Sequence, residues 1–276
     1  MSKITGDQLL EAVYRQEIEQ KKNMTKDKIK VGVDLGTSSI VIVVLNEENL
    51  PLACFSEDAQ VVRDGLVVNF FEASKILERL KYKAEELVGR DLLFASGAIP
   101  PQTGEHSQKA VAHVMEAAGF EVDQVVDEPY AAAQVLEVHN GGVVDIGGGT
   151  TGISVFEGGE QVFSADEATG GYHMSLVLSG YYKISLEDAE KHKRNPQKYE
   201  EHFQVLYPVA EKMAHLSQRF IQQYGKPVEL VYLVGGTTVF PQFKDVFQKV
   251  LGIPVYQPFH PRLVTPVGIA MLSKEF

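Results

Sequence analysis

The feature that most constrains the fold is a strand–turn–strand unit that occurs twice in the chain. The first copy reads VDLGTSSIVIVV and the second reads VDIGGGTTGISVF. In each copy an apolar, β-branched run reaches an aspartate, a turn rich in glycine and hydroxyl side chains follows, and a second apolar run leaves the turn. The two copies align with one extra residue in the second turn. This duplication predicts two β-sheets that face each other, and 276 residues are enough for two domains.

Strands and helices alternate around both copies, which predicts an α/β fold. Helical periodicity appears in EASKILERLKYKAEELVG and SQKAVAHVMEAAGF, with a buried strand, DLLFASGAI, between them. We expect an N-terminal appendage at 1–28. Lobe I is expected at 29–139 together with a C-terminal helix at 265–276. Lobe II is expected at 140–264, with a helical insert at about 175–225.

The appendage contains few apolar side chains, and these recur at roughly helical spacing among Glu, Gln and Lys. Two interpretations remain open. We favour a frayed or surface-docked terminal helix, and the alternative is a short amphipathic tag for the surface of a partner.

The composition excludes several classes of partner. Lys and Arg number 26 against 37 Asp and Glu, which gives a net charge of −11. A surface this acidic repels phosphate backbones and anionic lipids, so we expect neither a nucleic-acid nor a membrane partner. Cys54 is the only cysteine, and no apolar run has the length of a membrane span. The sequence therefore favours a cytoplasmic protein.

The repeated turns have the chemistry of a phosphate site. Glycines let backbone N–H groups approach a phosphate closely, and threonine or serine hydroxyls add donors. If Asp34 and Asp145 face one cleft, their charges require a cation, and Mg²⁺ carrying a triphosphate supplies it. As a structural alternative, the glycines at 147–149 form only a bend.

Two further segments fit the same hypothesis. A third glycine turn, in LVGGTTVF, would let a base or ribose lie against the bare backbone of Gly235 and Gly236. Glu128 comes just before Pro129, where a carboxylate is able to orient an attacking water. As structural alternatives, the two glycines form only a tight turn at the end of a strand, and Glu128 is an acidic residue that the helix dipole favours at a helix N-terminus.

Five segments resemble, in order, the phosphate-1, connect-1, phosphate-2, adenosine and connect-2 motifs of the actin-like ATPase superfamily. They are VGVDLGTSSIVIVV, VVDEPYAAAQVL, VVDIGGGTTGISVF, LVGGTTVFPQFKDVF and TPVGIAML, and the resemblance covers Ile29 to Phe276. The superfamily joins actin, the heat-shock chaperones and the sugar kinases, and EHSQKAVAHVMEAAGFEVDQVVDEPYAAA resembles the chaperone branch most closely. The implied fold has two duplicated ribonuclease H-like lobes with an interlobe nucleotide cleft. More narrowly, the chain resembles a compact chaperone-like family encoded with ethanolamine utilisation and its bacterial microcompartment.

The resemblance implies ATP or ADP with Mg²⁺ as the ligands. It implies that Asp34 and Asp145 hold Mg²⁺ through waters, and that Glu128, Asp145 and Thr150 are catalytic, with Glu128 positioning the hydrolytic water. The implied nucleotide contacts are Gly36, Thr37, Ser38, Gly147, Gly148, Gly149, Thr151, Glu190, Lys193, Gly235, Gly236 and Thr237. For Glu190 and Lys193 an ordinary surface ion pair, three residues apart on a helix, is an equal alternative.

The chain departs from the chaperone pattern in three respects. The lobe that carries the chaperones' catalytic lysine is missing before VVRDGLVV, and Arg63 is the only cation nearby, so we expect slow or assisted hydrolysis. Val239 stands where the chaperones have the arginine that stacks on adenine. The peptide-binding domain is absent, so we expect any client to bind the ATPase lobes themselves.

The leading hypothesis is a weak Mg-dependent ATPase whose lobes close on ATP and open on ADP to control protein partners. The narrower resemblance implies that the partners are ethanolamine-pathway enzymes or microcompartment shell proteins, in microcompartment assembly or enzyme reactivation. It also implies an association of the cytoplasmic protein with the microcompartment. Three alternatives remain open: a small-molecule kinase, an actin-like filament protein and a pseudo-ATPase scaffold.

Overall fold

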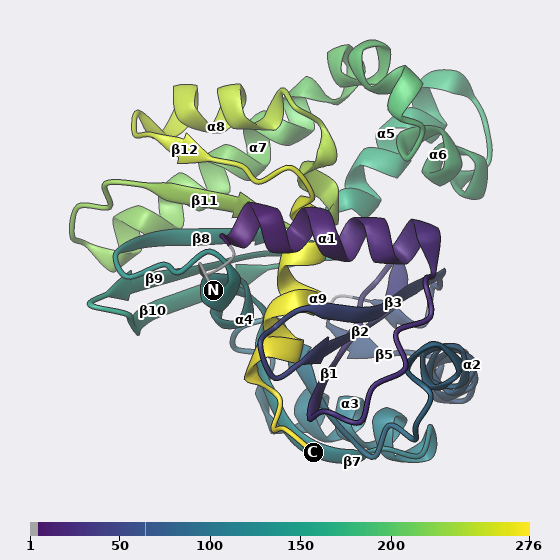
Figure 1. The fold of residues 1–276 in the computed structure, drawn as a ribbon. Helices are drawn as coiled ribbons and strands as arrows, with labels where there is room; N and C mark the ends of the chain where they lie inside the picture. Colours follow the sequence, from purple (N-terminus) through teal and green to yellow (C-terminus); the bar gives the residue numbers. More distant parts are fainter. Residues whose placement is uncertain (1–4, 64) are drawn as a thin grey trace.

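Two five-stranded sheets with the same strand order form the framework of the protein (Figure 1). The structure is a computed structural model, and it describes residues 5–63 and 65–276. In the first sheet the order is β3-β2-β1-β6-β7, and in the second it is β10-β9-β8-β11-β12. Each sheet therefore has a three-stranded antiparallel part followed by parallel strands. The predicted duplication and the predicted α/β fold are confirmed.

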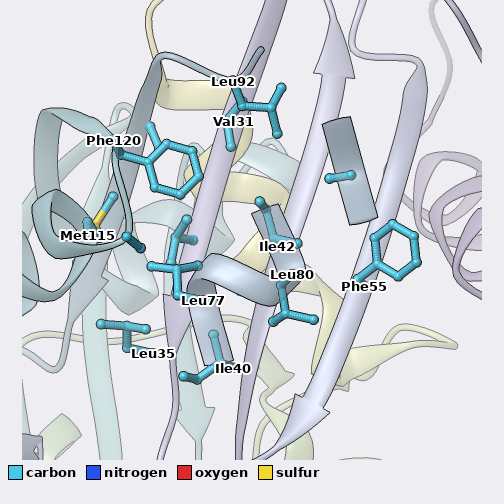
Figure 2. Close-up of a cluster of buried hydrophobic side chains, with 14 of the residues drawn as sticks. Val31, Leu35, Ile40, Ile42, Phe55, Leu77, Leu80, Leu92, Met115 and Phe120 are labelled. Atoms are coloured by element: carbon cyan, nitrogen blue, oxygen red, sulfur yellow. The ribbon is translucent and has the colours of Figure 1, made fainter. Parts of the chain in front are cut away.

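The first sheet consists of β1 (Ile29–Leu35), β2 (Ser39–Asn46), β3 (Pro51–Asp58), β6 (Phe94–Ile99) and β7 (Glu121–Asp127). Helices α2 (Phe70–Val88) and α3 (Gly104–Ala117) cover one of its faces, and a small hairpin of β4 (Val62–Arg63) and β5 (Leu66–Val67) precedes α2. Figure 2 shows Leu77 and Leu80 of α2 packed among Ile40 and Ile42 of β2. The β-branched side chains of β1 and β2 thus form the core that their sequence pattern predicts.

The second sheet repeats this arrangement with β8 (Gly141–Ile146), β9 (Thr151–Glu157), β10 (Glu160–Glu167), β11 (Val231–Val234) and β12 (Val255–Tyr256). Four helices pack against this sheet: α5 (Gly171–Tyr182), α6 (Leu186–Lys193) and α7 (Tyr199–Tyr224) from the segment that we predicted as a helical insert, and α8 (Phe243–Leu251) after β11. The 3₁₀ turn η1 (Pro196–Lys198) precedes α7, and the 3₁₀ turn η2 (Gly236–Val239) follows β11.

The two repeated turns have the same length in the structure, which corrects the alignment that we expected. Leu35 pairs with Ile40 in the first unit, and Ile146 pairs with Thr151 in the second. In both units the pairing spans five positions. The extra residue that the sequence suggested is therefore not in the turn.

Helices α4 (Glu128–Val135) and α9 (Pro261–Leu272) pack against each other between the two sheets. A Cβ on Gly268 of α9 would overlap the carbonyl oxygen of Ala131 in α4, so only glycine permits this approach. Helix α9 begins at Pro261, whereas the sequence predicted a helix at 265–276. Proline is favoured in the first helical turn because its missing N–H needs no partner there.

The last residues after α9 are also not helical, because the backbone of Phe276 exchanges two hydrogen bonds with that of Ile29 at the start of β1. Near the other terminus, α1 (Gly6–Glu19) is a docked helix whose Leu9, Leu10 and Val13 are buried. The interpretation of residues 1–28 that we favoured is confirmed for this helix. The lobe boundaries expected from the sequence stay predictions. Across 5–63 and 65–276, none of the helices has both the length and the apolarity needed to cross a membrane.

Candidate functional site

The two repeated turns lie against each other at the ends of β1 and β8. A hydrogen bond from Gly36 N to Ser39 O closes the first turn at 3.0 Å, and one from Gly147 N to Thr150 O closes the second at 3.1 Å. A Cβ on Gly148 would overlap the Ser38 hydroxyl, so the turns are in direct contact. The two turns are therefore adjacent, with the side chains of Thr37 and Ser38 against Gly148.

The third glycine turn packs onto the second. Gly235 has φ of +95°, and a Cβ there would overlap a carboxylate oxygen of Asp145. The Thr237 hydroxyl donates a hydrogen bond of 2.7 Å to the carbonyl oxygen of Gly147. A glycine is thus required at 235 both by backbone conformation and by space. The three turns form one wall around a common space.

Three carboxyl groups converge on this space, and each has a raised pKa. Burial, followed by the nearby charge of Asp145, raises the pKa of Asp34 to about 7. Burial raises the pKa of Asp145 to about 6, although the Thr265 hydroxyl donates to its Oδ2 at 2.5 Å and lowers that pKa. Burial and then the charges of Asp145 and Asp34 raise the pKa of Glu128, at the start of α4, well above its ordinary value.

No ion pair neutralises these three carboxyl groups among the residues that the structure describes. The same part of the chain contains no group of three or more His, Cys, Asp and Glu side chains that could ligate a metal directly. The carboxylate oxygens nevertheless suit a hard cation such as Mg²⁺, which usually keeps several of its waters. The donor set and the bare glycine backbone fit a hydrated Mg²⁺ ion carrying phosphates.

The space is a cleft of about 690 Å³, within the range of ordinary small-ligand sites. The structure brings almost all the predicted site residues to its lining: Asp34, Gly36, Thr37, Ser38, Glu128, Asp145, Gly147, Gly148, Gly149, Thr150, Glu190, Lys193, Gly235, Gly236 and Thr237. Thr151 is the exception. It is fully buried, and its hydroxyl donates to the carbonyl oxygen of Thr169 at 2.5 Å.

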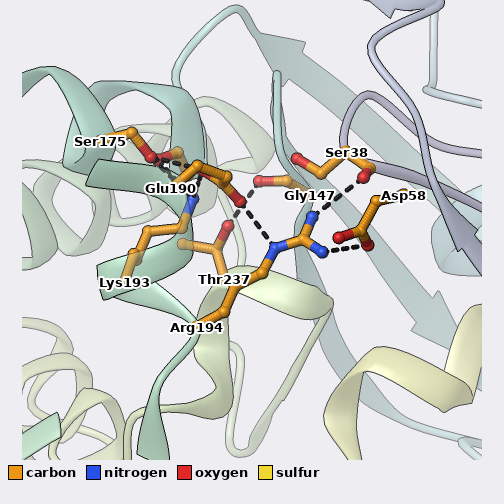
Figure 3. Close-up of polar contacts among 9 residues, drawn as sticks. Ser38, Asp58, Gly147, Ser175, Glu190, Lys193, Arg194 and Thr237 are labelled. Carbon is orange, nitrogen blue, oxygen red and sulfur yellow. Dashed lines mark hydrogen bonds and ion pairs between the residues drawn. The ribbon is translucent and has the colours of Figure 1, made fainter. Parts of the chain in front are cut away.

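Glu190 and Lys193 are not a surface pair. Lys193 is 7% exposed, and its Nζ donates to Glu190 Oε2 at 2.6 Å, to Gly171 O at 2.9 Å and to Ser175 Oγ at 3.1 Å. Figure 3 shows the pair beside Thr237 and Gly147. Burial lowers the pKa of Lys193, while Glu190 opposes that shift. The alternative of an ordinary exposed ion pair is therefore wrong.

Arg194 is a cleft residue that the sequence reasoning missed. Its Nη2 donates to Ser38 O at 2.9 Å, its Nη1 contacts Asp58, and its Nε donates to Glu190 Oε1 at 2.9 Å (Figure 3). Its position directly after Lys193 in LEDAEKHKR is the sequence feature that could have identified it as a cleft residue. The expectation that Arg63 is the only cation near the site is wrong, because Arg63 is exposed on β4 and does not line the cleft.

Comparison with known proteins identifies relatives of this chain. The family model described as type IV pilus assembly protein PilM matches residues 105–264. The chain is 41% identical over 252 residues to the ethanolamine utilization protein EutJ of Escherichia coli K12, covering 91% of this chain and 88% of that protein. It is 27% identical over 235 residues to the chaperone protein HscA homolog of Rickettsia peacockii, covering 74% of this chain and 40% of that protein.

Solved structures show the same relationship. The crystal structure of EutJ from Carboxydothermus hydrogenoformans has a TM-score of 0.91 and 44% identity, covering 97% of this chain and 98% of that one. MreB5 of Spiroplasma citri, solved bound to ADP, has a TM-score of 0.67 and 17% identity, covering 87% of this chain and 94% of that one. The second likeness concerns the fold alone. Together these comparisons confirm the predicted superfamily and the narrower resemblance.

Proposed function

We propose that this chain, which belongs to the EutJ family of ethanolamine-utilisation proteins, is a chaperone-like protein that binds Mg-ATP and hydrolyses it slowly. With PilM, the chain also belongs to the actin-like ATPase superfamily. One observation carries the proposal. Asp34 and Asp145 occupy equivalent positions near the ends of β1 and β8, and both line the same glycine-rich cleft. Two carboxylates and three glycine turns suit a cation that carries phosphates.

The proposed roles follow from position in the cleft. Asp34 and Asp145 hold the waters of Mg²⁺, and Glu128 orients the water that attacks the terminal phosphate. The bound Mg²⁺ supplies positive charge that neutralises the phosphates. The turns at 36–38 and 147–150 bind phosphate oxygens through N–H and hydroxyl groups. Gly235, Gly236, Thr237, Glu190 and Lys193 surround the nucleoside, and Val239 contributes an apolar contact.

Slow turnover is supported by the positions of the cations. Lys193 is fully engaged by Gly171, Ser175 and Glu190, and Arg194 is engaged by three acceptors. Charge on the transferring phosphate is normally stabilised by a free lysine or arginine. The same observation favours a pseudo-ATPase scaffold as the second candidate, in which nucleotide binding alone controls the lobes.

Lobe closure is proposed as the link between nucleotide and partner. Arg194 joins α6 to the turn at 36–38, α4 and α9 meet at the Gly268 contact, and one apolar cluster includes both Val43 of β2 and Phe156 of β9. A ligand that binds the closed arrangement more tightly shifts the population toward it. The proposed partners are enzymes or shell proteins of ethanolamine utilisation, and the proposed location is the cytoplasm in association with the microcompartment.

The test combines turnover with partner retention. We would measure ADP release with and without ethanolamine, acetate and sugars, and retention of purified ethanolamine-pathway enzymes and shell proteins with ATP and with ADP. The proposal predicts slow release that is independent of small acceptors, and retention that differs between the nucleotides. Acceptor-dependent turnover would indicate a kinase. ATP-dependent pelleting on sedimentation would indicate a filament protein. Nucleotide-dependent retention without ADP release would favour the scaffold.

A further inference from the structure

Helix α1 lies across both lobes, although its sequence reads as an appendage. In Figure 1 it runs, in purple, between the two sheets. Its buried Leu9, Leu10 and Val13 share one apolar cluster with Val43 of β2, Phe156 of β9 and Leu263 of α9. A Thr5–Gln8 capping box defines its start. The helix packs against β3 of the first sheet, and its Asp7 accepts a hydrogen bond from the Tyr256 hydroxyl of β12 in the second.

The polar face of α1 holds the segment that leads into α9. Glu11 pairs with His260 at 3.0 Å, and the Tyr14 ring stacks on the His260 ring with 4.1 Å between centroids. Glu17 binds the Arg262 guanidinium with both carboxylate oxygens, and it also accepts a hydrogen bond of 2.7 Å from Ser56 of β3. Glu17 is thus the point at which α1 ties α9 to the first sheet.

The residues that α1 holds are part of the cleft wall. Tyr14, His260 and Arg262 all line the cleft. The carbonyl oxygen of Pro261, between the latter two, accepts a hydrogen bond of 3.0 Å from Gly235 N. A Cβ on Gly236 would lie 3.8 Å from that of Arg262. A continuous series of contacts therefore runs from α1, through residues 260–262, to the third glycine turn.

We infer that Glu17 and Tyr14 of α1 are positioning residues of the nucleotide site, which hold the 260–262 wall against the Gly235–Gly236 turn and so tighten nucleotide binding by slowing its release. The inference rests on the proposed function and goes beyond it, because it assigns control of the site to a helix outside the duplicated lobes. The linkage is reciprocal, so bound nucleotide stabilises the docked position of α1. A partner that lifted α1 would accelerate nucleotide release.

The test measures dissociation of the fluorescent analogue mant-ATP, with Mg²⁺, by stopped flow. Glu17→Gln keeps the side-chain volume and weakens the Arg262 contact, so we expect release to be roughly three- to tenfold faster, as for the loss of a charge-assisted hydrogen bond. Tyr14→Ala should act in the same direction. Glu19→Gln is the matched control, because Glu19 pairs with Lys21 at the exposed end of α1, and it should leave the rate unchanged.

A double-mutant cycle separates positioning from a general loss of stability. If Glu17 acts through Arg262, Glu17→Gln should have no further effect on release in an Arg262→Gln background. Equal effects in both backgrounds would overturn the inference. A second measurement uses the wild-type chain alone. Mg-mant-ATP should slow amide hydrogen exchange in α1, and unchanged exchange at saturation would contradict the inference.

The outcomes also separate this inference from the proposed function. If the wild-type protein binds mant-ATP but Glu17→Gln and Tyr14→Ala release it at the wild-type rate, only the role of α1 is overturned. If the wild-type protein binds no nucleotide, both are overturned.

Discussion

Arg194, directly after α6, donates a hydrogen bond of 2.9 Å to the carbonyl oxygen of Ser38 in the turn between β1 and β2. The same guanidinium contacts Asp58 at the end of β3. These contacts join α6 to the first sheet, and all three residues line the cleft. We therefore predict that Arg194→Ala opens the cleft and speeds association of mant-ATP by roughly two- to tenfold, since two weak, partly exposed contacts are lost.

The control is Arg219→Ala, which removes an exposed pair with Glu167 that lies outside the cleft lining. Association measured by stopped flow should be unchanged in that variant. Slower association in Arg194→Ala would instead mean that the guanidinium attracts the phosphates, and would contradict the bridging role.

The raised pKa values predict how stability depends on pH without nucleotide. Asp34, at about 7, and Asp145, at about 6, bind protons in the folded state at pH values where the unfolded chain has lost them. The two protonated carboxyl groups therefore contribute fully to the free energy of unfolding below about pH 4, and this contribution is lost as pH rises through 6 and 7. In EDTA we expect the wild-type Tm to decrease from pH 5 to pH 8 more steeply than that of Asp34→Asn.

The expected difference is several degrees, because about 1 kcal/mol moves the Tm of a domain of this size by roughly 2–4 °C. Thermal unfolding at both pH values measures it, and Glu116→Gln on the exposed face of α3 serves as the control. Parallel pH profiles for wild type and Asp34→Asn would show that Asp34 does not titrate as described.

The contact between α4 and α9 predicts a stability effect at a single glycine. Gly268→Ala places a methyl group on the Ala131 carbonyl oxygen, so we expect a loss of about 1–3 kcal/mol in the free energy of unfolding. Gly180→Ala in α5 meets no atom within 4 Å and should stabilise the protein by about 0.5–1 kcal/mol. Urea unfolding of the two variants compares them, and a neutral Gly268→Ala would refute the close approach.

The proposed role of Glu128 predicts that a substitution there affects hydrolysis but not nucleotide binding. Glu128→Gln keeps the shape of the side chain but removes the carboxylate that orients water, so Mg-ATP should still bind while single-turnover hydrolysis falls by about 10²-fold or more. Quenched-flow measurement with radiolabelled ATP detects even slow hydrolysis. Wild-type turnover in this variant would assign the water to another group.

The duplicated framework could be predicted because its signals are local. Each strand is an apolar run of β-branched residues, and each turn is marked by glycine next to aspartate, so VDLG and VDIG identify both copies within a few residues. Most residues of the cleft lining were implied by the resemblance of these segments to the superfamily motifs. Thr151 was also implied as a nucleotide contact but does not line the cleft, because its hydroxyl in β9 donates to the carbonyl oxygen of Thr169.

The contacts across the cleft could not be predicted in the same way. Arg194 and Ser38 are 156 positions apart, and no periodicity links them. Arg63 was chosen because it lies near the expected lysine position in sequence, but the β4–β5 hairpin leaves it exposed. The docking of α1 depends on a cluster drawn from both sheets, which exists only once the lobes have packed.

The central claim is that Asp34 and Asp145 share one cation that carries the nucleotide phosphates. Calorimetric titration of Mg-ATP into wild type, Asp145→Asn and the Glu116→Gln control tests it most directly. The account predicts Mg²⁺-dependent binding to wild type and control, and binding to Asp145→Asn weaker by about tenfold or more, which is about 1.4 kcal/mol. Equally tight binding to Asp145→Asn, or no binding to the wild-type protein, would contradict it.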